Sequence, residues 1–140
     1  MKRTASAIWN GDLKLGKGTL SSQGGVLDKT PYSFTTRFEQ GAGTNPEELI
    51  AAAQAGCFTM QLSAFLALAG FTAEELTTNA TLTFEQVEGT WTITTIHLDL
   101  TGRVPGIDVA KFEEIAKDAK AKCPVSRVLK AEITLAVKLG

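Results

Sequence analysis

The chain has 140 residues, of which 44% are hydrophobic and 21% are charged, and its formal net charge is −1. This length is typical of one soluble domain with a hydrophobic core of its own. No basic stripe or run of basic residues stands out in the sequence, which argues against nucleic acid or an anionic membrane as the partner.

The first forty residues predict short strands separated by glycine-rich turns. Strand-like segments cover residues 4–9, 16–21 and 32–38. The separators N-G-D and Q-G-G are typical of hairpin turns, because asparagine and glycine adopt the backbone conformations that such turns require. This part of the chain is therefore expected to be β-structure.

A long helix is predicted from about residue 46 to residue 69. Thr44 or Asn45 can cap its start, Pro46 suits its first turn, and Gly70 suits the position just after its end. The helix is apolar on nearly every side, which a monomer of this size would struggle to cover. We therefore expect a homodimer interface to bury part of it.

The segment 49–69 carries no charge and is long enough to cross a bilayer. It is rich in alanine, however, and four polar side chains interrupt it, which favours a buried core helix over a membrane span. The N-terminal residues show no apolar stretch of the kind found in signal peptides. A cytoplasmic protein is expected, in which a persistent structural disulfide would be unusual.

The second half of the chain predicts two long strands, a helix and a final strand. The strands cover about 76–87 and 91–103, around a turn at Glu88-Gly89. Asp108 can cap a helix that runs to about residue 121, and alternating apolar residues predict a last strand near the C-terminus. This order indicates an α+β fold in a single domain, residues 1–140.

Metal and histidine chemistry find little support in the sequence. His97 is the only histidine, and its neighbours on a predicted strand are Ile96 and Leu98. Hydrolase triads and most zinc sites need a histidine with suitably spaced partners. No metal site and no cofactor are predicted.

The two cysteines carry the strongest chemical signal. Cys57 lies in the apolar helix, where a lone cysteine is more often a core residue than a nucleophile. Cys123 directly precedes Pro124, at the start of a short helical turn where amide dipoles favour a thiolate. Together they suggest an attacking thiol and a resolving thiol, a pair that is more often catalytic or redox-sensing than structural in the cytoplasm.

Cys57 needs a source of activation outside its own helix. It lies in mid-helix, where the helix dipole has little effect, and a buried thiol without a nearby cation has a raised pKa and is inert. Arg37, at the end of the predicted strand 32–38, is the candidate cation, although it could equally be a solvated charge at a strand end.

A carboxylate that could hold Arg37 is expected at Glu47 or Glu48. Glu47 precedes Cys57 by ten residues, which in a straight helix is a rise of about 15 Å and a rotation of roughly 80°. Glu48 faces the opposite side. Both glutamates could serve only the helix cap, and for Glu48 this is the simpler role. Glu47 of one chain can approach Cys57 of another if two copies of the helix pack about a twofold axis.

Three segments together resemble one protein family. They are W-N-G-D-L-K-L-G-K-G-T, T-N-P-E-E-L-I-A-A-A-Q-A-G-C-F and K-C-P-V-S-R-V-L-K-A-E-I-T-L. They are similar to the OsmC/Ohr family of bacterial thiol-dependent hydroperoxide reductases, in particular its osmotically inducible branch, over essentially the whole chain. The resemblance implies antiparallel sheets wrapped around a long central apolar helix, in an intertwined homodimer with two active sites at the subunit interface.

The resemblance also implies roles for four residues. Cys57 matches the peroxidatic cysteine and Cys123 the resolving cysteine, which form an intramolecular disulfide in each cycle. Arg37 matches the arginine that stabilises the thiolate and the peroxide, and Glu47 the glutamate that orients it. Organic hydroperoxides are the implied substrates, with hydrogen peroxide a weaker one, and an external dithiol such as a lipoyl-bearing protein is the implied reductant.

Three apolar residues near Cys57 are candidates for substrate contact. Phe58, Met60 and Phe65 could line an apolar approach that favours organic hydroperoxides, although core packing is the commoner role for such residues. Two other functions stay open. The pair of thiols could be a redox sensor that changes the binding of a partner protein, or the chain could bind an apolar ligand without catalysis, with inert thiols.

Overall fold

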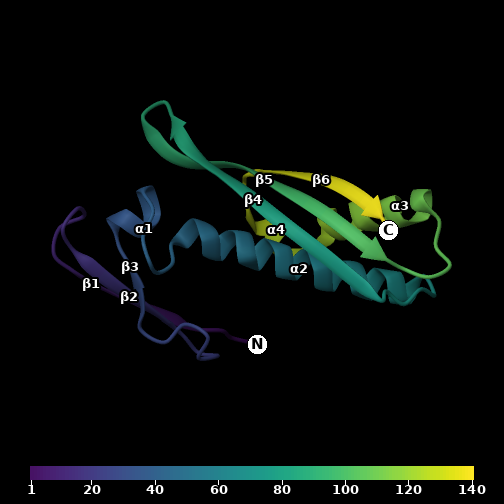
Figure 1. Cartoon of the computed structure of the whole chain (residues 1–140), viewed down its shortest axis with the longest axis horizontal. Helices are drawn as coiled ribbons and strands as arrows, with labels where there is room; N and C mark the ends of the chain where they lie inside the picture. Colours follow the sequence, from purple (N-terminus) through teal and green to yellow (C-terminus); the bar gives the residue numbers. More distant parts are fainter. The chain divides into compact units, whose positions relative to one another are not determined.

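The computed structural model describes residues 1–140, and these divide into two compact units, residues 1–49 and 50–140. The first unit contains three strands and a short helix, and the long helix begins in it (Figure 1). These elements are β1 Ala5–Asn10, β2 Lys17–Ser22, β3 Thr30–Tyr32, α1 Phe34–Phe38 and α2 Pro46–Leu68. The single domain predicted from the sequence stays a prediction.

The first unit is built on an antiparallel sheet with the order β1-β2-β3. Gly18 of β2 pairs with Trp9 of β1 and with Tyr32 of β3. A side chain at Gly18 would collide with both aromatic rings. Because glycine leaves this space free, the rings of Trp9 and Tyr32 meet across the middle strand, with their centroids 5.3 Å apart.

The strand predicted for residues 32–38 is wrong beyond Tyr32, because residues 34–38 form the helix α1. Ser33 and Thr36 make a reciprocal capping box: the Ser33 hydroxyl accepts from the Thr36 amide, and the Thr36 hydroxyl accepts from the Ser33 amide. These bonds satisfy amides that a helix start leaves free, and they override the strand preference of phenylalanine and threonine. Arg37 consequently lies in the last turn of a helix.

The second unit contains most of α2, a three-stranded sheet and two further helices (Figure 1). The sheet has the order β4-β5-β6. Its strands are β4 Glu75–Val87, β5 Thr90–Arg103 and β6 Glu132–Leu139, and the helices are α3 Val109–Lys122 and α4 Pro124–Val128.

The strand directions in this sheet agree only in part with the predicted antiparallel arrangement. β4 and β5 are antiparallel around Glu88 and Gly89, which both have positive φ angles, as expected for a tight hairpin. β5 and β6 are parallel. The two helices α3 and α4 connect them, and a crossover of this length returns the chain in the original direction.

The core of the second unit lies between one face of this sheet and the helices α2 and α3. Thr59 of α2 donates a hydrogen bond to Thr78 of β4, and Lys120 of α3 donates one to the carbonyl of Ile133 in β6. The buried residues that fill this space are Phe58, Leu62, Leu66, Ile96, Leu98, Leu100, Phe112, Ile115, Ala116 and Ala119. The predicted helix capped by Asp108 is confirmed, and its apolar residues face this core.

Helix α2 is confirmed in its type and bounds, and only one side of it is covered. By length and composition it could cross a membrane. Its side chains Phe58, Leu62 and Leu66 nevertheless form the core of the fold, so α2 is not a membrane span. The other side carries exposed small or apolar residues, namely Ala52, Ala53, Gly56, Met60, Ser63, Ala64 and Ala67.

Candidate active site

The two cysteines, 66 positions apart in the chain, meet inside the second unit. Cys57 lies on α2 and is half-buried, whereas Cys123 is fully buried. Both are free thiols, and the Sγ of Cys123 donates a hydrogen bond to the Sγ of Cys57 at 2.8 Å. A disulfide between them needs only a small approach of the sulfur atoms.

Cys123 occupies the joint between two helices. Its backbone amide donates to the carbonyl of Ala119 and so makes Cys123 the C-cap of α3. Its carbonyl accepts from the amide of Arg127 in α4. The side chain does not cap α4, so the thiol is free to face Cys57. The predicted short helix after Cys123 is confirmed. The Cys123 sulfur, however, contacts Cys57 and makes no cap hydrogen bond at the start of this helix.

The surroundings of Cys57 disfavour the thiolate form of its side chain. Burial raises the pKa of Cys57 above its ordinary value, and the hydrogen bond and charge of the neighbouring Cys123 raise it further. The backbone amide of Val125 hydrogen-bonds to the Cys57 sulfur and lowers the pKa, but by less than burial and the hydrogen bond with Cys123 raise it. The second unit thus holds the two thiols together in surroundings that raise the pKa of Cys57.

An ion pair in the first unit joins Arg37 of α1 to Glu47 in the first turn of α2. The Nη2 of Arg37 donates to Oε1 of Glu47 at 2.8 Å, and its Nε donates to Oε1 at 3.1 Å and to Oε2 at 3.3 Å. The Glu47 side chain is 11% exposed and that of Arg37 is 37% exposed. A two-pronged bond of this kind fixes the guanidinium plane as well as its position.

Asn45 explains why Glu47 rather than Glu48 pairs with Arg37. The side-chain oxygen of Asn45 accepts from the Glu48 amide at 2.8 Å and so caps α2, while its NH2 group donates to the carbonyl of Thr36 at 2.9 Å. The same NH2 group lies 3.4 Å from the Glu48 carboxylate, which is exposed. Asn45 therefore ties α1 to the start of α2 and leaves Glu47 directed at Arg37.

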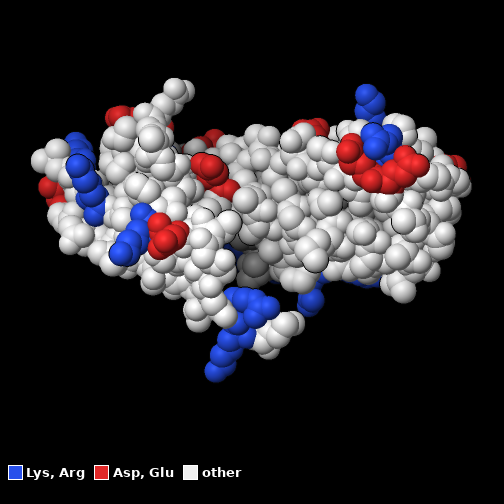
Figure 2. Space-filling view, turned by 60° about the horizontal axis from the view of Figure 1, so that its bottom comes forward, with Lys and Arg blue, Asp and Glu red and all other residues white.

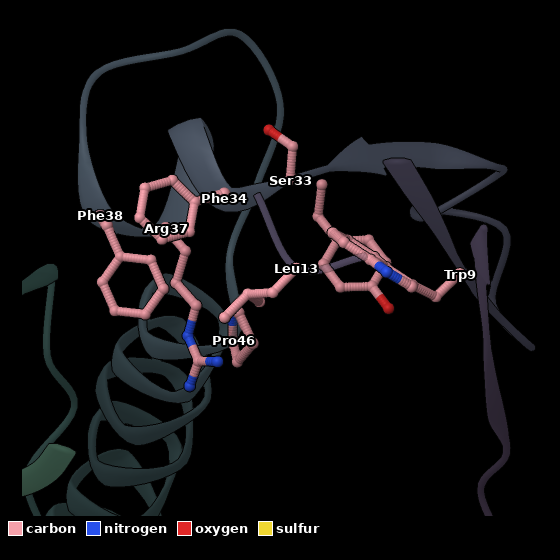
Figure 3. A pocket seen from close by; sticks show the side chains of 8 residues that line it. Trp9, Leu13, Ser33, Phe34, Arg37, Phe38 and Pro46 are labelled. Carbon is pink, nitrogen blue, oxygen red and sulfur yellow. The ribbon is translucent and has the colours of Figure 1, made fainter. Parts of the chain in front are cut away.

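A pocket of about 330 Å³ opens beside Arg37 (Figure 3). Phe34 and Phe38 lie next to each other, with ring centroids 4.8 Å apart, and the guanidinium carbon of Arg37 lies 5.3 Å from the Phe38 centroid. Apolar and aromatic side chains supply most of the lining, and Arg37 is its only charged residue. The lining residues are Trp9, Leu13, Tyr32, Ser33, Phe34, Arg37, Phe38 and Pro46.

The three apolar residues predicted to contact substrate lie in different surroundings. Phe58 has no exposed surface and packs in the core, as the alternative reading expected. Met60 is 77% exposed, and Phe65 is half-buried with the ammonium of Lys122 5.5 Å from its ring centroid. A substrate role for Met60 and Phe65 stays a prediction.

His97 is a half-buried residue of β5. Its Nδ1 contacts the hydroxyl of Thr134 at 2.5 Å, and its Nε2 lies 3.4 Å from a carboxylate oxygen of Asp99. These neighbours hold the ring on the strand, in agreement with an ordinary structural role.

Elsewhere on the molecule, charged side chains of both signs occur in small groups on a mostly uncharged face (Figure 2).

The sequence does not predict the contact between Gln54 and Ser126. The Nε2 of Gln54, on α2, donates to the hydroxyl of Ser126, on α4, at 2.7 Å. This bond joins the same two helical segments that carry Cys57 and that follow Cys123. A polar side chain in an otherwise apolar stretch, close to a cysteine, was the available signal.

Comparisons with known proteins agree with this arrangement. The model of the OsmC-like protein family matches residues 39–138. The chain belongs to the OsmC/Ohr family. It is 52% identical over 137 residues to the peroxiredoxin OsmC of Escherichia coli strain K12, covering 98% of this chain and 96% of that protein.

More distant relatives support the same membership. An organic hydroperoxide resistance protein of Xanthomonas axonopodis pv. citri is 30% identical over 105 residues, covering 71% of this chain and 69% of that protein. Among solved structures, an OsmC-like protein of unknown function from Vibrio cholerae has a TM-score of 0.78 at 17% identity, covering 98% of this chain and 99% of the other. OhrB of Bacillus subtilis has a TM-score of 0.69 at 22% identity, covering 98% of each chain. These last two likenesses establish the OsmC-like fold.

Proposed function

We propose that this chain is a thiol-dependent peroxidase of the cytoplasm that reduces organic hydroperoxides, and hydrogen peroxide more weakly. The observation that carries the proposal is the 2.8 Å contact between the Sγ atoms of Cys57 and Cys123. Two free thiols at this distance can be oxidised to a disulfide without a rearrangement of the fold. The relatives named peroxiredoxin and organic hydroperoxide resistance protein support a hydroperoxide as the oxidant.

The reaction begins at Cys57, the more exposed of the two thiols. Its thiolate attacks the oxygen of the hydroperoxide that carries the hydrogen, the O–O bond breaks, and the leaving alkoxide takes up a proton from solvent and departs as an alcohol. Cys57 becomes a sulfenic acid. The sulfur of Cys123 then attacks Cys57, the S–O bond breaks, and the hydroxyl leaves as water with the proton of the Cys123 thiol.

An external dithiol completes the cycle. It attacks the disulfide to give a mixed disulfide, and its second thiol then displaces the protein thiol, so that the reductant leaves in the oxidised cyclic form. A lipoyl-bearing protein is a reductant of this class. No cofactor is required, because the two electrons come from the thiols.

Arg37 supplies the activation that the surroundings of Cys57 lack. Its guanidinium stabilises the thiolate and donates hydrogen bonds to the peroxide oxygens, while Glu47 holds it in a fixed orientation. The raised pKa of Cys57 supports this assignment, because burial and the hydrogen bond with Cys123 disfavour the thiolate. The apolar lining of the pocket beside Arg37 supports a substrate with a hydrocarbon part.

We assign each Arg37–Glu47 pair to Cys57 of a second copy of the chain, in a homodimer with active sites at its interface. Ten helical residues correspond to a rise of about 15 Å, too far for Glu47 to serve the thiol of its own helix directly. The exposed apolar side of α2 is the surface that a second chain would cover. Co-expression of an Arg37→Ala chain with a Cys57→Ser chain tests this assignment.

Mixed dimers of these two variants contain one site in which an intact Cys57 faces an intact Arg37 of the other chain. We therefore expect about a quarter of the wild-type activity to return when the chains associate at random. Cys57→Ser alone should be inactive, and Arg37→Ala alone should keep about 1% of the wild-type rate or less. No recovery in the mixed dimers would place Arg37 and Cys57 of one chain in the same site.

The chemistry is tested first by intact mass. Reduced protein is mixed with one equivalent of cumene hydroperoxide, quenched within seconds and measured without reductant, and a loss of about 2 Da is expected. Cys57→Ser should show no change, and Cys123→Ser should gain oxygen at Cys57 without forming an intramolecular disulfide. An unchanged wild-type mass would favour a binding protein with inert thiols, and slow oxidation without turnover by a dithiol would favour a sensor.

A further inference from the structure

Gln54 is a polar side chain buried in an apolar core. It has 0% exposed surface and lies among the largest fully buried side chains of the chain, which are otherwise apolar residues and Cys123. Its Nε2 donates to the hydroxyl of Ser126 at 2.7 Å, and its Oε1 is buried without a hydrogen-bond partner in the chain. A half-satisfied amide lowers stability relative to an apolar side chain of the same size. Stability alone therefore does not account for Gln54.

The hydrogen bond of Gln54 runs beside the contact of the two thiols. Gln54 precedes Cys57 by about one turn of α2, and Ser126 follows Cys123 by about one turn in α4. Residues separated by one turn share a helix face. The Gln54–Ser126 bond and the Cys57–Cys123 contact thus join the same two segments, about one turn apart.

Helix α4 has few other means of holding its place. It has five residues, its cap makes no side-chain hydrogen bond, and none of its residues is fully buried. Val125 and Leu129 pack against the core, and the amide of Val125 hydrogen-bonds to the Cys57 sulfur. Both the Val125 bond and the thiol–thiol bond end on the sulfur that the reaction changes.

We propose that the Gln54–Ser126 hydrogen bond is a positioning device that keeps Cys123 in place for the second chemical step. This inference rests on the proposed peroxidase function. When Cys57 becomes a sulfenic acid, its sulfur carries a hydroxyl group, and the hydrogen bonds that it made as a thiol change. The bond between Gln54 and Ser126 involves no reacting atom, so it persists and holds α4 against α2 throughout the cycle.

Two reactions compete for the sulfenic acid of Cys57. In one, the Cys123 sulfur displaces the hydroxyl group, an S–S bond forms and water leaves. In the other, a second hydroperoxide transfers an oxygen atom to the sulfur, an alcohol leaves, and Cys57 becomes a sulfinic acid. A well-placed Cys123 favours the first reaction, so the hydrogen bond protects the enzyme from inactivation by its own substrate.

The test compares Gln54→Leu, Ser126→Ala and the double variant with the wild type. Each reduced protein is mixed with a tenfold excess of tert-butyl hydroperoxide and quenched at intervals, and the sulfenic, disulfide and sulfinic forms are separated by intact mass. We expect the first oxidation to keep its rate and disulfide closure to slow about three- to tenfold in all three variants. The sulfinic fraction should rise accordingly, and the double variant should be no worse than either single one.

A matched control is available on the same helix. Thr59 of α2 donates to the hydroxyl of Thr78 in β4, also at 2.7 Å, so Thr78→Val removes a bond of equal length that does not reach α4. This variant should divide its products between disulfide and sulfinic acid as the wild type does. Gln54→Leu should keep the wild-type melting temperature, because it also removes the unsatisfied Oε1.

The outcomes separate this inference from the proposed function. Wild-type disulfide formation with unchanged product ratios in Gln54→Leu and Ser126→Ala would overturn the positioning role alone. An equal loss in the first and second steps, together with a lower melting temperature, would also overturn it, since that pattern indicates general structural damage. A wild-type protein that forms no disulfide would overturn both the positioning role and the proposed peroxidase function.

Discussion

The two pairs of candidate catalytic residues differ in what holds them and in what they lack. Arg37 and Glu47 form a charged pair that is partly exposed beside an open pocket. Cys57 and Cys123 form a pair of free thiols, one half-buried and the other fully buried in an apolar core. The first pair has a cation but no nucleophile, and the second has a nucleophile in a setting that raises its pKa.

One side chain with an amide group stands beside each pair. Asn45 links α1 to α2 next to the Arg37–Glu47 pair, and Gln54 links α2 to α4 next to the cysteines. Both amides connect the long helix to a five-residue helix that carries or follows a reactive residue. Short helices have little stability of their own, so a single hydrogen bond to a longer element matters more for them. In each pair, therefore, one amide side chain links a short helix to α2.

The largest effect should come from removing the cation. Arg37→Ala should slow the oxidation of Cys57 by about 10² to 10³-fold, as the loss of one preorganised charged donor typically does. Because the pKa of Cys57 is raised by its surroundings, the variant's rate should keep climbing with pH above the ordinary range of a thiol. Stopped-flow oxidation by cumene hydroperoxide across pH measures both effects.

Arg37→Lys is the matched control, since it keeps the charge but loses the two-pronged bond to Glu47. Its rate of Cys57 oxidation should lie between those of the wild type and Arg37→Ala. A pH profile for Arg37→Ala identical to that of the wild type would show that Arg37 does not set the thiolate population.

A smaller effect should follow from the exposed side of α2. A methyl group at Gly56 would meet no atom of its own chain within 4 Å, so Gly56→Ala should stabilise an isolated helix by about 1 kcal/mol. In the proposed homodimer a second chain covers this side, and the added methyl should raise the dimer dissociation constant by about tenfold. Sedimentation equilibrium measures this change.

Gly24→Ala is the control for Gly56→Ala, because a methyl group at Gly24 also meets nothing in the chain and Gly24 lies outside the helices and strands. It should leave the dimer unchanged. Stabilisation by Gly56→Ala at every protein concentration would indicate that solvent, not a second chain, faces this side of α2.

The smallest effect should come from Asn45, and it separates capping from positioning. Asn45→Ala removes the cap of α2, at a cost of about 1 kcal/mol in the free energy of unfolding, and it also removes the bond to Thr36. Asn45→Asp keeps the cap acceptor but loses the donor to Thr36. Both variants should slow Cys57 oxidation less than tenfold, while only Asn45→Ala should lower the midpoint of urea unfolding. Equal rates of Cys57 oxidation in Asn45→Asp and the wild type would show that Asn45 acts only as the cap of α2.

Local signals made the long helix and the β4–β5 hairpin predictable from the sequence. Asn45, Pro46 and Gly70 mark the ends of α2, and Glu88 with Gly89 marks the hairpin turn. The sequence predicts a strand at residues 34–38 because Phe and Thr favour strands, whereas the Ser33–Thr36 capping box makes this segment a helix. The alternation in β6 shows a buried face but not the strand's direction, so its parallel pairing with β5 was not predictable.

The candidate site was predictable in its reactive residues and not in their support. The two cysteines stand out by residue type, whereas Arg37 and Glu47 are singled out by the family resemblance. The partner of Gln54 did not stand out, because a bond between residues 72 positions apart depends on the tertiary structure. Helix periodicity shows where a polar side chain sits on its own helix but not what it meets across the core.

The separation of the two cysteines has a consequence for the energetics of each catalytic cycle. A bond between residues 66 positions apart closes a loop that contains β4, β5 and α3, and a cross-link of that span restricts the unfolded chain by about 4 kcal/mol. By thermodynamic linkage, disulfide formation is more favourable in the folded enzyme than in the unfolded chain by a similar amount. The oxidised enzyme should therefore melt at a higher temperature than the reduced enzyme. Reopening the loop then favours a reductant that closes a ring of its own, as a dithiol does and a monothiol cannot.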